Sequence, residues 1–147
     1  MKTILLLHGP NLNLLGTRDK AHYGTVTLDI IEDLVKQEAL KFNCEVICFQ
    51  SNHEGSLIDT IQENRRTCIG IIINPGALTH YSYALRDALV DAKSPIIEVH
   101  LSDISQREDF RKKSVISDIC SKTISGKKEL GYIEAVQYLL GDLNNVR

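Results

Sequence analysis

Residues 8–24, HGPNLNLLGTRDKAHYG, place many polar groups directly after an apolar run. The segment is far longer than the 2–6 residues that usually join a strand to a helix. It contains amides, an arginine and a tyrosine: Asn11, Asn13, Arg18, Tyr23. Further along, Glu98 and His100 stand two residues apart, which places both side chains on one face of a strand. A carboxylate beside an imidazole orients the ring and supports a role in proton transfer.

Short apolar, β-branched runs alternate with stretches whose apolar residues recur at helical spacing. The predicted strands are Thr3–Leu7, Glu45–Gln50, Ile69–Ile73, Pro95–Val99 and Lys122–Ser125. Strands too apolar to alternate, separated by amphipathic helices, predict a parallel sheet covered on both faces. We therefore expect an α/β, flavodoxin-like doubly wound fold with a five-stranded parallel sheet, in one catalytic domain over residues 1–147.

In open α/β sheets, ligands bind outside the carboxyl ends of the strands, so the residues at these ends belong together. The polar residues at and after the first, third and fourth strands are Asn11, Arg18, Tyr23, Asn74, His80, Glu98, His100 and Ser102. Arg107 and Arg111 follow the last of them, spaced as one helical turn. The sequence therefore predicts one polar site at this edge of the sheet.

Each of these residues also has a structural interpretation when it is taken alone. Asn11 and Asn74 are typical turn formers, and Ser102 is a typical helix cap. His53 or His80 could adjoin a helix cap, Arg107 and Arg111 could form a solvated helix face, and Tyr23 could anchor its loop. Their convergence on one sheet edge favours the functional interpretation.

Composition and motifs exclude several functions. A formal net charge of −2 gives no basic footprint for nucleic acid. The apolar run Ile4–Leu7 is too short to cross a bilayer, and no signal-peptide pattern precedes it, so we expect a cytoplasmic protein without a membrane partner. The four cysteines form no C-x-x-C pair and are expected to be reduced. No G-x-G-x-x-G, Walker or G-x-S-x-G motif is present.

A metal site is not predicted, because His80, Glu98 and His100 form too loose a set of ligands. The open alternative from another class is a non-catalytic flavodoxin-like module that binds a nucleotide or flavin at the same edge.

Several motifs together resemble the type II 3-dehydroquinate dehydratases, over essentially the whole chain. They are GPNLNLLGTR, HYG, QSNHEGSLIDTIQ, INPGALTHYSYALRDAL, IEVHLSDISQREDFR and a late GY. The resemblance implies removal of water from 3-dehydroquinate to give 3-dehydroshikimate through an enolate, without a cofactor. It also implies the shikimate pathway or quinate breakdown, and a homododecamer built as a tetramer of trimers.

The resemblance also implies catalytic roles. Tyr23 matches the base, and Arg18 matches the cation that favours its ionised form. Asn11 matches the residue that holds a water on the enolate oxygen. His100 matches the general acid that protonates the leaving hydroxyl, and Glu98 orients it.

Substrate binding is implied for a second set of residues. Asn74, His80 and Arg111 match the residues that hold the substrate hydroxyls. The backbone of Leu101 and Ser102, with the Ser102 hydroxyl, matches the carboxylate site, as amides that open a helix would. Asp87 matches an acid that reaches a neighbouring subunit. The opening loop, bracketed by Gly16 and Gly24, is expected to act as a lid.

Overall fold

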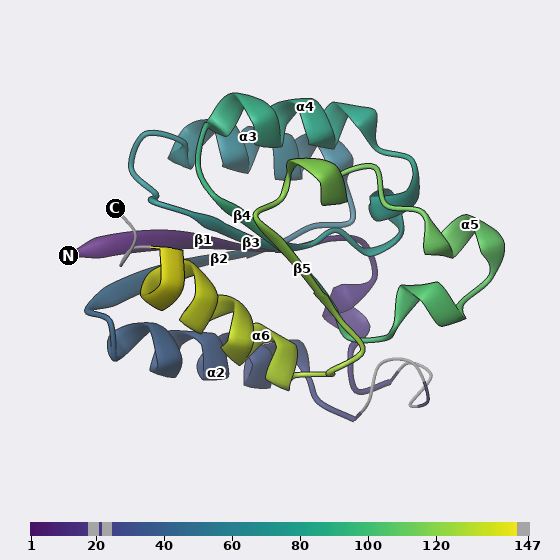
Figure 1. Cartoon of the computed structure of the whole chain (residues 1–147), viewed down its shortest axis with the longest axis horizontal. Helices are drawn as coiled ribbons and strands as arrows, with labels where there is room; N and C mark the ends of the chain where they lie inside the picture. The colour runs from purple at the N-terminus through teal and green to yellow at the C-terminus, as the bar shows by residue number, and fades with distance from the viewer. Residues whose placement is uncertain (18–20, 22–24, 144–147) are drawn as a thin grey trace.

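The computed structural model describes residues 1–17, 21 and 25–143. These residues form a parallel sheet with the strand order β2-β1-β3-β4-β5 (Figure 1). The strands are β1 (Lys2–His8), β2 (Cys44–Gln50), β3 (Ile71–Asn74), β4 (Ile96–His100) and β5 (Lys122–Ser125). This is the order of a flavodoxin-like doubly wound fold, so the predicted fold class is confirmed.

Helices cover both faces of the sheet. Figure 1 shows α3 and α4 on one face and α2 and α6 on the other. Their bounds are α2 (Leu28–Leu40), α3 (Glu54–Asn64), α4 (Tyr83–Ala92) and α6 (Leu130–Val136), which continues as the π-helix η5 (Gln137–Asp142). Shorter turns lie between them: η1 (Leu12–Leu14), η2 (Gly76–His80), η3 (Ile104–Gln106), α5 (Asp109–Lys112) and η4 (Ser117–Ile119).

Alternate residues of β1 supply the two cores, one on each face of the sheet. Ile4 and Leu6 pack with the α2 and α6 side, whereas Leu5 and Leu7 pack with the α3 and α4 side. All four are buried, with at most 1% of their surface exposed. Two buried faces explain why this strand is continuously apolar instead of alternating.

Two strands begin and end later than predicted. Ile71, not Ile69, is the first residue of β3 to pair with both β1 and β4. Pro95 has no N–H to donate and lies before β4, although its carbonyl accepts from the Ile71 amide over 2.9 Å. At the other ends of these strands, Asn74 and His100 are the last strand residues instead of loop residues. The sheet therefore fixes their backbones.

The loops that follow β1 and β3 are in contact through their backbones. The Gly9 amide donates to the Asn74 carbonyl over 2.8 Å, and a Cβ atom on Gly9 would lie 2.1 Å from the Pro75 carbonyl oxygen. Gly76 has a φ of +61°, and a Cβ there would lie 2.9 Å from the Pro10 carbonyl oxygen. Glycine is therefore required at both positions.

Candidate active site

A pocket lies at the carboxyl edge of the sheet, where the sequence predicted a site. Its lining comes from the segments after β1, β3 and β4 and from α5. The predicted residues that line it are Asn11, Asn74, His80, His100, Leu101, Ser102 and Arg111. Arg107, which also follows the fourth strand, lines it as well. The sequence did not indicate the other lining residues, which are Pro10, Leu12, Gly76, Ala77 and Ile104. Apolar and glycine positions gave no signal, because such residues are ordinarily assigned to cores and turns.

His100 lines this pocket and is paired with Glu98. The His100 Nε2 atom donates to Glu98 Oε2 over 2.5 Å, and both side chains are buried. Because Nε2 is occupied by the carboxylate, Nδ1 is the nitrogen left for a ligand. The side chains of Glu98 and His100 are therefore in direct contact on β4.

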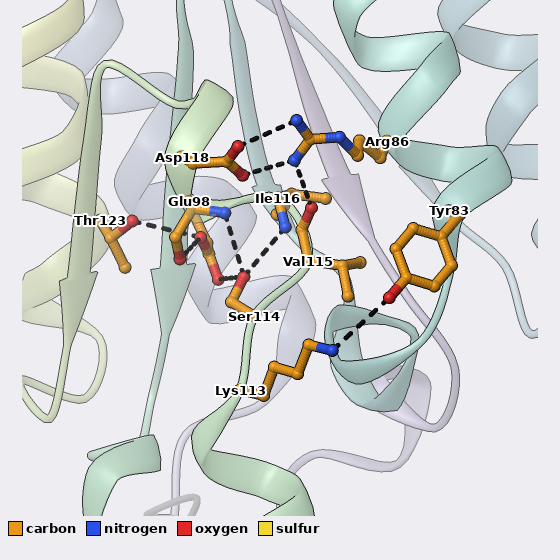
Figure 2. Close-up of polar contacts among 10 residues, drawn as sticks. Tyr83, Arg86, Glu98, Lys113, Ser114, Val115, Ile116, Asp118 and Thr123 are labelled. Carbon is orange, nitrogen blue, oxygen red and sulfur yellow. Dashed lines mark hydrogen bonds and ion pairs between the residues drawn. The ribbon is translucent and has the colours of Figure 1, made fainter.

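Three hydroxyl groups also contact the Glu98 carboxylate. They belong to Ser114, Ser117 and Thr123, at 2.9, 2.6 and 3.2 Å. Figure 2 shows the Ser114 and Thr123 side chains directed at the carboxylate. Burial opposes the charged form of Glu98, but the hydrogen bond and charge of His100 and the serine hydroxyls outweigh it and lower the pKa of Glu98. Glu98 is therefore a carboxylate at neutral pH.

His80 is held by the segment that follows α5. Its Nδ1 atom contacts the Lys113 carbonyl oxygen at 2.6 Å, and because a carbonyl can only accept, Nδ1 carries the hydrogen. Nε2 is then an acceptor. The ring also meets Phe110 edge to face, with 6.2 Å between centroids. The sequence placed His80 in the site, and the structure adds the tautomer.

Asn74 combines its turn-forming and site-lining roles. Its Oδ1 accepts from the Gly76 amide over 3.1 Å, which is the turn geometry expected of asparagine. Its Nδ2 donates to the Tyr132 hydroxyl over 3.3 Å inside the core. The amide is therefore held from both ends, while it also lines the pocket.

Asn11 adopts the left-handed backbone conformation, with a φ of 71°, at the start of η1. Its own amide donates to Asn52 Oδ1 over 2.9 Å, which joins the segment after β1 to the segment after β2. Gln50 strengthens this connection, because its Nε2 donates to the Gly9 carbonyl over 3.2 Å. Asn11 lines the pocket, and its side chain makes no capping hydrogen bond to η1.

The arginine segment differs from the sequence prediction in two respects. No helix opens at Leu101 and Ser102; Asp103 instead caps the short η3 turn, its Oδ1 accepting from the Ser105 amide over 3.0 Å. Arg107 is extended and ends that turn, whereas Arg111 belongs to α5, so they are not one helical turn apart. A polar Asp103 cap and the break at Arg107 divide the expected helix into two short pieces.

The two arginines nevertheless meet at the pocket. Arg107 donates from Nη1 to Ser102 Oγ over 3.3 Å, and Arg111 donates from Nε to Glu108 Oε2 over 2.5 Å. The hydrogen bond and charge of Arg111 lower the pKa of Glu108. Arg107 thus adds positive charge beside Ser102, whereas the charge of Arg111 is paired with Glu108 at the same pocket.

Three predicted residues are not among those described at the pocket. Arg18 and Tyr23, with Gly24 of the expected lid, lie outside the described residues. Asp87 is exposed on α4 and does not line the pocket. Within the described part of the chain, no three His, Cys, Asp or Glu side chains are grouped as they would be around a metal ion. None of the helices in those same ranges is long and apolar enough to cross a membrane.

A doubly wound sheet with a histidine–carboxylate pair and polar groups at its carboxyl edge defines a flavodoxin-like α/β enzyme. Comparison with known proteins narrows this class. The model of the family Dehydroquinase class II matches residues 2–140. The chain belongs to the class II dehydroquinase family.

Named relatives agree with this assignment. A 3-dehydroquinate dehydratase of Bacillus cytotoxicus is 52% identical over 97% of this chain and 98% of its own length. A catabolic 3-dehydroquinase 2 of Aspergillus flavus is 50% identical over 97% of this chain and 95% of its own length. The crystal structure of a type II dehydroquinase from Butyrivibrio crossotus is 46% identical and covers 94% of this chain and 97% of its own, with a TM-score of 0.90. These matches do not favour a flavodoxin-like binding module.

Proposed function

We propose that this chain is a hydro-lyase that removes water from 3-dehydroquinate to give 3-dehydroshikimate, with residues 1–147 as one catalytic domain. Membership of the class II dehydroquinase family supports the activity. The observation that carries the proposal is the buried His100–Glu98 pair, which presents a proton-transfer group to the pocket.

The elimination needs a base, a stabiliser for the enolate and an acid. Tyr23, activated by the cation of Arg18, takes the proton from the carbon next to the ketone, and the electron pair moves to the ketone oxygen to form the enolate. Asn11 holds the water that stabilises this oxyanion. The enolate then collapses to the conjugated enone as the carbon–oxygen bond breaks, and His100 gives a proton to the departing hydroxyl. Tyr23 then releases to solvent the proton that it took, and His100 takes a proton from solvent, so both groups regain their starting protonation states.

The pocket lining fits the groups of the substrate. Asn74, His80 and Arg111 hold the ring hydroxyls, since they offer amide, imidazole and guanidinium groups around one cavity. The carboxylate lies at the backbone of Leu101 and Ser102, where Arg107 adds positive charge. No cofactor or metal is part of this mechanism, because proton transfers alone complete the elimination.

The assembly and location belong to the same proposal. The chain forms a homododecamer, built as a tetramer of trimers, in which Asp87 reaches the site of a neighbouring subunit; the exposure of this side chain on α4 supports that placement. The cytoplasmic location is supported by four cysteines that are free in the structure. Relatives with both unqualified and catabolic names match at about equal identity, so shikimate synthesis and quinate breakdown are both compatible with the activity.

Addition of 3-dehydroquinate to the purified chain tests the activity directly. The product has a carbon–carbon double bond conjugated with its ketone, so ultraviolet absorbance rises as water leaves. A His100→Asn variant should remove most of this rise while it retains the fold. Absence of product with the wild-type chain at any protein concentration would contradict the proposal, as would full activity of the variant.

A further inference from the structure

The Glu98 carboxylate accepts hydrogen bonds on both of its oxygen atoms. Oε2 accepts from His100 Nε2 over 2.5 Å and from Ser114 Oγ over 2.9 Å. Oε1 accepts from Ser117 Oγ over 2.6 Å and from Thr123 Oγ1 over 3.2 Å. Glu98 is 0% exposed, so these four groups replace water around the carboxylate.

The direction of the bond from Ser114 follows from the other contacts of its hydroxyl group. Ser114 Oγ also accepts from the amides of Ile116 and Ser117, at 3.3 and 3.2 Å, so its hydrogen is left to donate to Glu98. A carboxylate that accepts hydrogen bonds from an imidazole and three hydroxyls is already satisfied in its ionised form, which is an acceptor only. The arrangement therefore suits the anion and not the neutral acid.

Few other charges surround this anion. Among the described residues, His100 is the ion-pair partner of Glu98. The Cys120 thiol is nearby, and burial followed by the charge of Glu98 raises its pKa to about 12, so it stays neutral. Arg86 on α4 is paired with Asp118 and with the Val115 carbonyl, as Figure 2 shows. From β3, the register partner of Glu98 is the apolar Ile73. Hydroxyl groups thus supply most of the solvation.

We infer that Ser117 and Thr123 are positioning residues for the dehydration, acting through Glu98 on His100. This inference rests on the proposed function. The two hydroxyls come from η4 and β5, do not line the pocket, and hold Oε1 while Oε2 holds the imidazole. The carboxylate plane is then fixed, and with it the ring that presents Nδ1 to the substrate.

Removal of these donors has a defined chemical consequence. Without them, Oε1 is a buried acceptor that lacks partners, and the carboxyl binds a proton more readily. A protonated Glu98 is a poorer acceptor for the Nε2 hydrogen, so the imidazole loses its fixed tautomer and orientation. The loss affects proton delivery to the leaving hydroxyl and leaves the substrate contacts of Asn74 and Arg111 in place.

The test uses Ser117→Ala, Thr123→Val and the double variant, each measured for kcat and KM across pH. Thr123→Val keeps the side-chain volume and removes the donor. For the double variant we expect kcat to fall by about 10–100-fold, by analogy with the loss of the hydrogen-bond partners that orient metal-binding histidines. KM should change by no more than about twofold, because substrate binding is not altered. The acidic limb of the kcat profile should move to higher pH.

Matched variants separate positioning from general damage. Ser117→Thr and Thr123→Ser retain the donors and should restore most of the turnover. Ser121→Ala removes an exposed hydroxyl between η4 and β5 and should leave kcat and the pH profile unchanged. If the double variant fails to fold, each single variant should show the same fall in kcat and the same shift of the pH profile, with a smaller magnitude. Folded variants with wild-type kcat and pH profile, whatever their melting temperature, would overturn the inference.

A second readout does not depend on turnover. Carbon-13 NMR of labelled glutamate carboxyl groups follows the ionisation of Glu98 directly. The midpoint should rise in the double variant and not in Ser121→Ala, and an unchanged midpoint would overturn the inference. If the wild-type chain fails to dehydrate 3-dehydroquinate, the proposed function fails, and the carboxyl titration still shows whether the hydroxyls hold Glu98 as an anion.

Discussion

The side chains of Asn74 and Tyr132 are joined by a buried hydrogen bond, in which Asn74 Nδ2 donates to the Tyr132 hydroxyl over 3.3 Å. Tyr132 is 0% exposed, and burial raises its pKa well above the ordinary value, so the phenol stays neutral. Asn74 is thus the point at which the core holds a pocket-lining side chain in a defined orientation.

Replacement of Tyr132 by phenylalanine should weaken substrate binding and stability together. The ring remains, but Asn74 Nδ2 loses its acceptor, so the free energy of unfolding should fall by about 1 kcal/mol. KM should rise because the amide is no longer held in one orientation, whereas kcat should change less. Urea unfolding and steady-state kinetics measure both quantities, with Tyr138→Phe as the control. A variant less stable by this amount but with the wild-type KM would contradict the role of the hydrogen bond.

Replacement of Tyr23 by phenylalanine should remove the proposed base and keep the ring. General base catalysis is typically worth about 10²–10⁴-fold, so kcat should fall by that order. Substrate binding, measured by calorimetry, should change little, because Asn74, His80 and Arg111 are unaltered. Near-normal turnover would show that another residue is the base.

Replacement of Arg18 by glutamine should lower turnover in a way that depends on pH. A phenol without a neighbouring cation has a pKa of about 10, so less of the phenolate is present at neutral pH. Residual activity should therefore rise as the pH is raised, and Tyr23→Phe should show no such recovery. The measurement is kcat of both variants as a function of pH, up to alkaline pH. A flat profile for the Arg18 variant would argue against activation of Tyr23 by this cation.

Glu98 should make stability depend on pH in the acidic range. Its pKa in the folded state lies below the ordinary value of 4.5, so the stabilisation is complete above that value and is lost as pH falls through the folded pKa. Urea unfolding from about pH 6 to about pH 3 should show a decline that is shallower in Glu98→Gln. Asp59→Asn, on the exposed side of α3, serves as the control. An equally steep decline in Glu98→Gln would assign the effect to other groups.

The proposed assembly predicts both a mass and a mutational effect. Light scattering of the wild-type chain should give a mass near that of about twelve subunits. Asp87→Asn should lower kcat/KM by about 10–100-fold if its charge binds in a neighbouring site, whereas Asp91→Asn on the same helix should not. A stable monomer with full activity would contradict the assembly and the role of Asp87 together.

The sheet and the position of the site were predictable because apolar periodicity reports burial. Leu5 and Leu7 belong to a run that fits a strand covered on both faces, and such strands direct their carboxyl ends to one edge. Strand ends were less predictable. The start of β4 depends on the missing amide hydrogen of Pro95, and the divided helix between Asp103 and Arg111 depends on a local cap that competes with helical spacing.

The surroundings of Glu98 were not predictable, although Glu98 itself was. Ser114, Ser117 and Thr123 carry common hydroxyl groups, and nothing in their spacing separates them from surface residues. They meet the carboxylate only because β5 lies beside β4, with Thr123 in register with Glu98. The buried phenol of Tyr132 similarly lies 58 residues from Asn74 in the sequence.

The contact between the Gly9–Pro10 and Pro75–Gly76 backbones has a consequence for inhibitor design. Pro10 and Gly76 of this contact line the pocket, and larger residues at Gly9 or Gly76 would collide with the backbone of the facing segment. A compound that hydrogen-bonds to these peptide groups would face a target that point substitutions cannot easily reshape. Resistance should arise instead at side-chain positions such as Ile104 and Arg107, where the wall can change without displacing the strands.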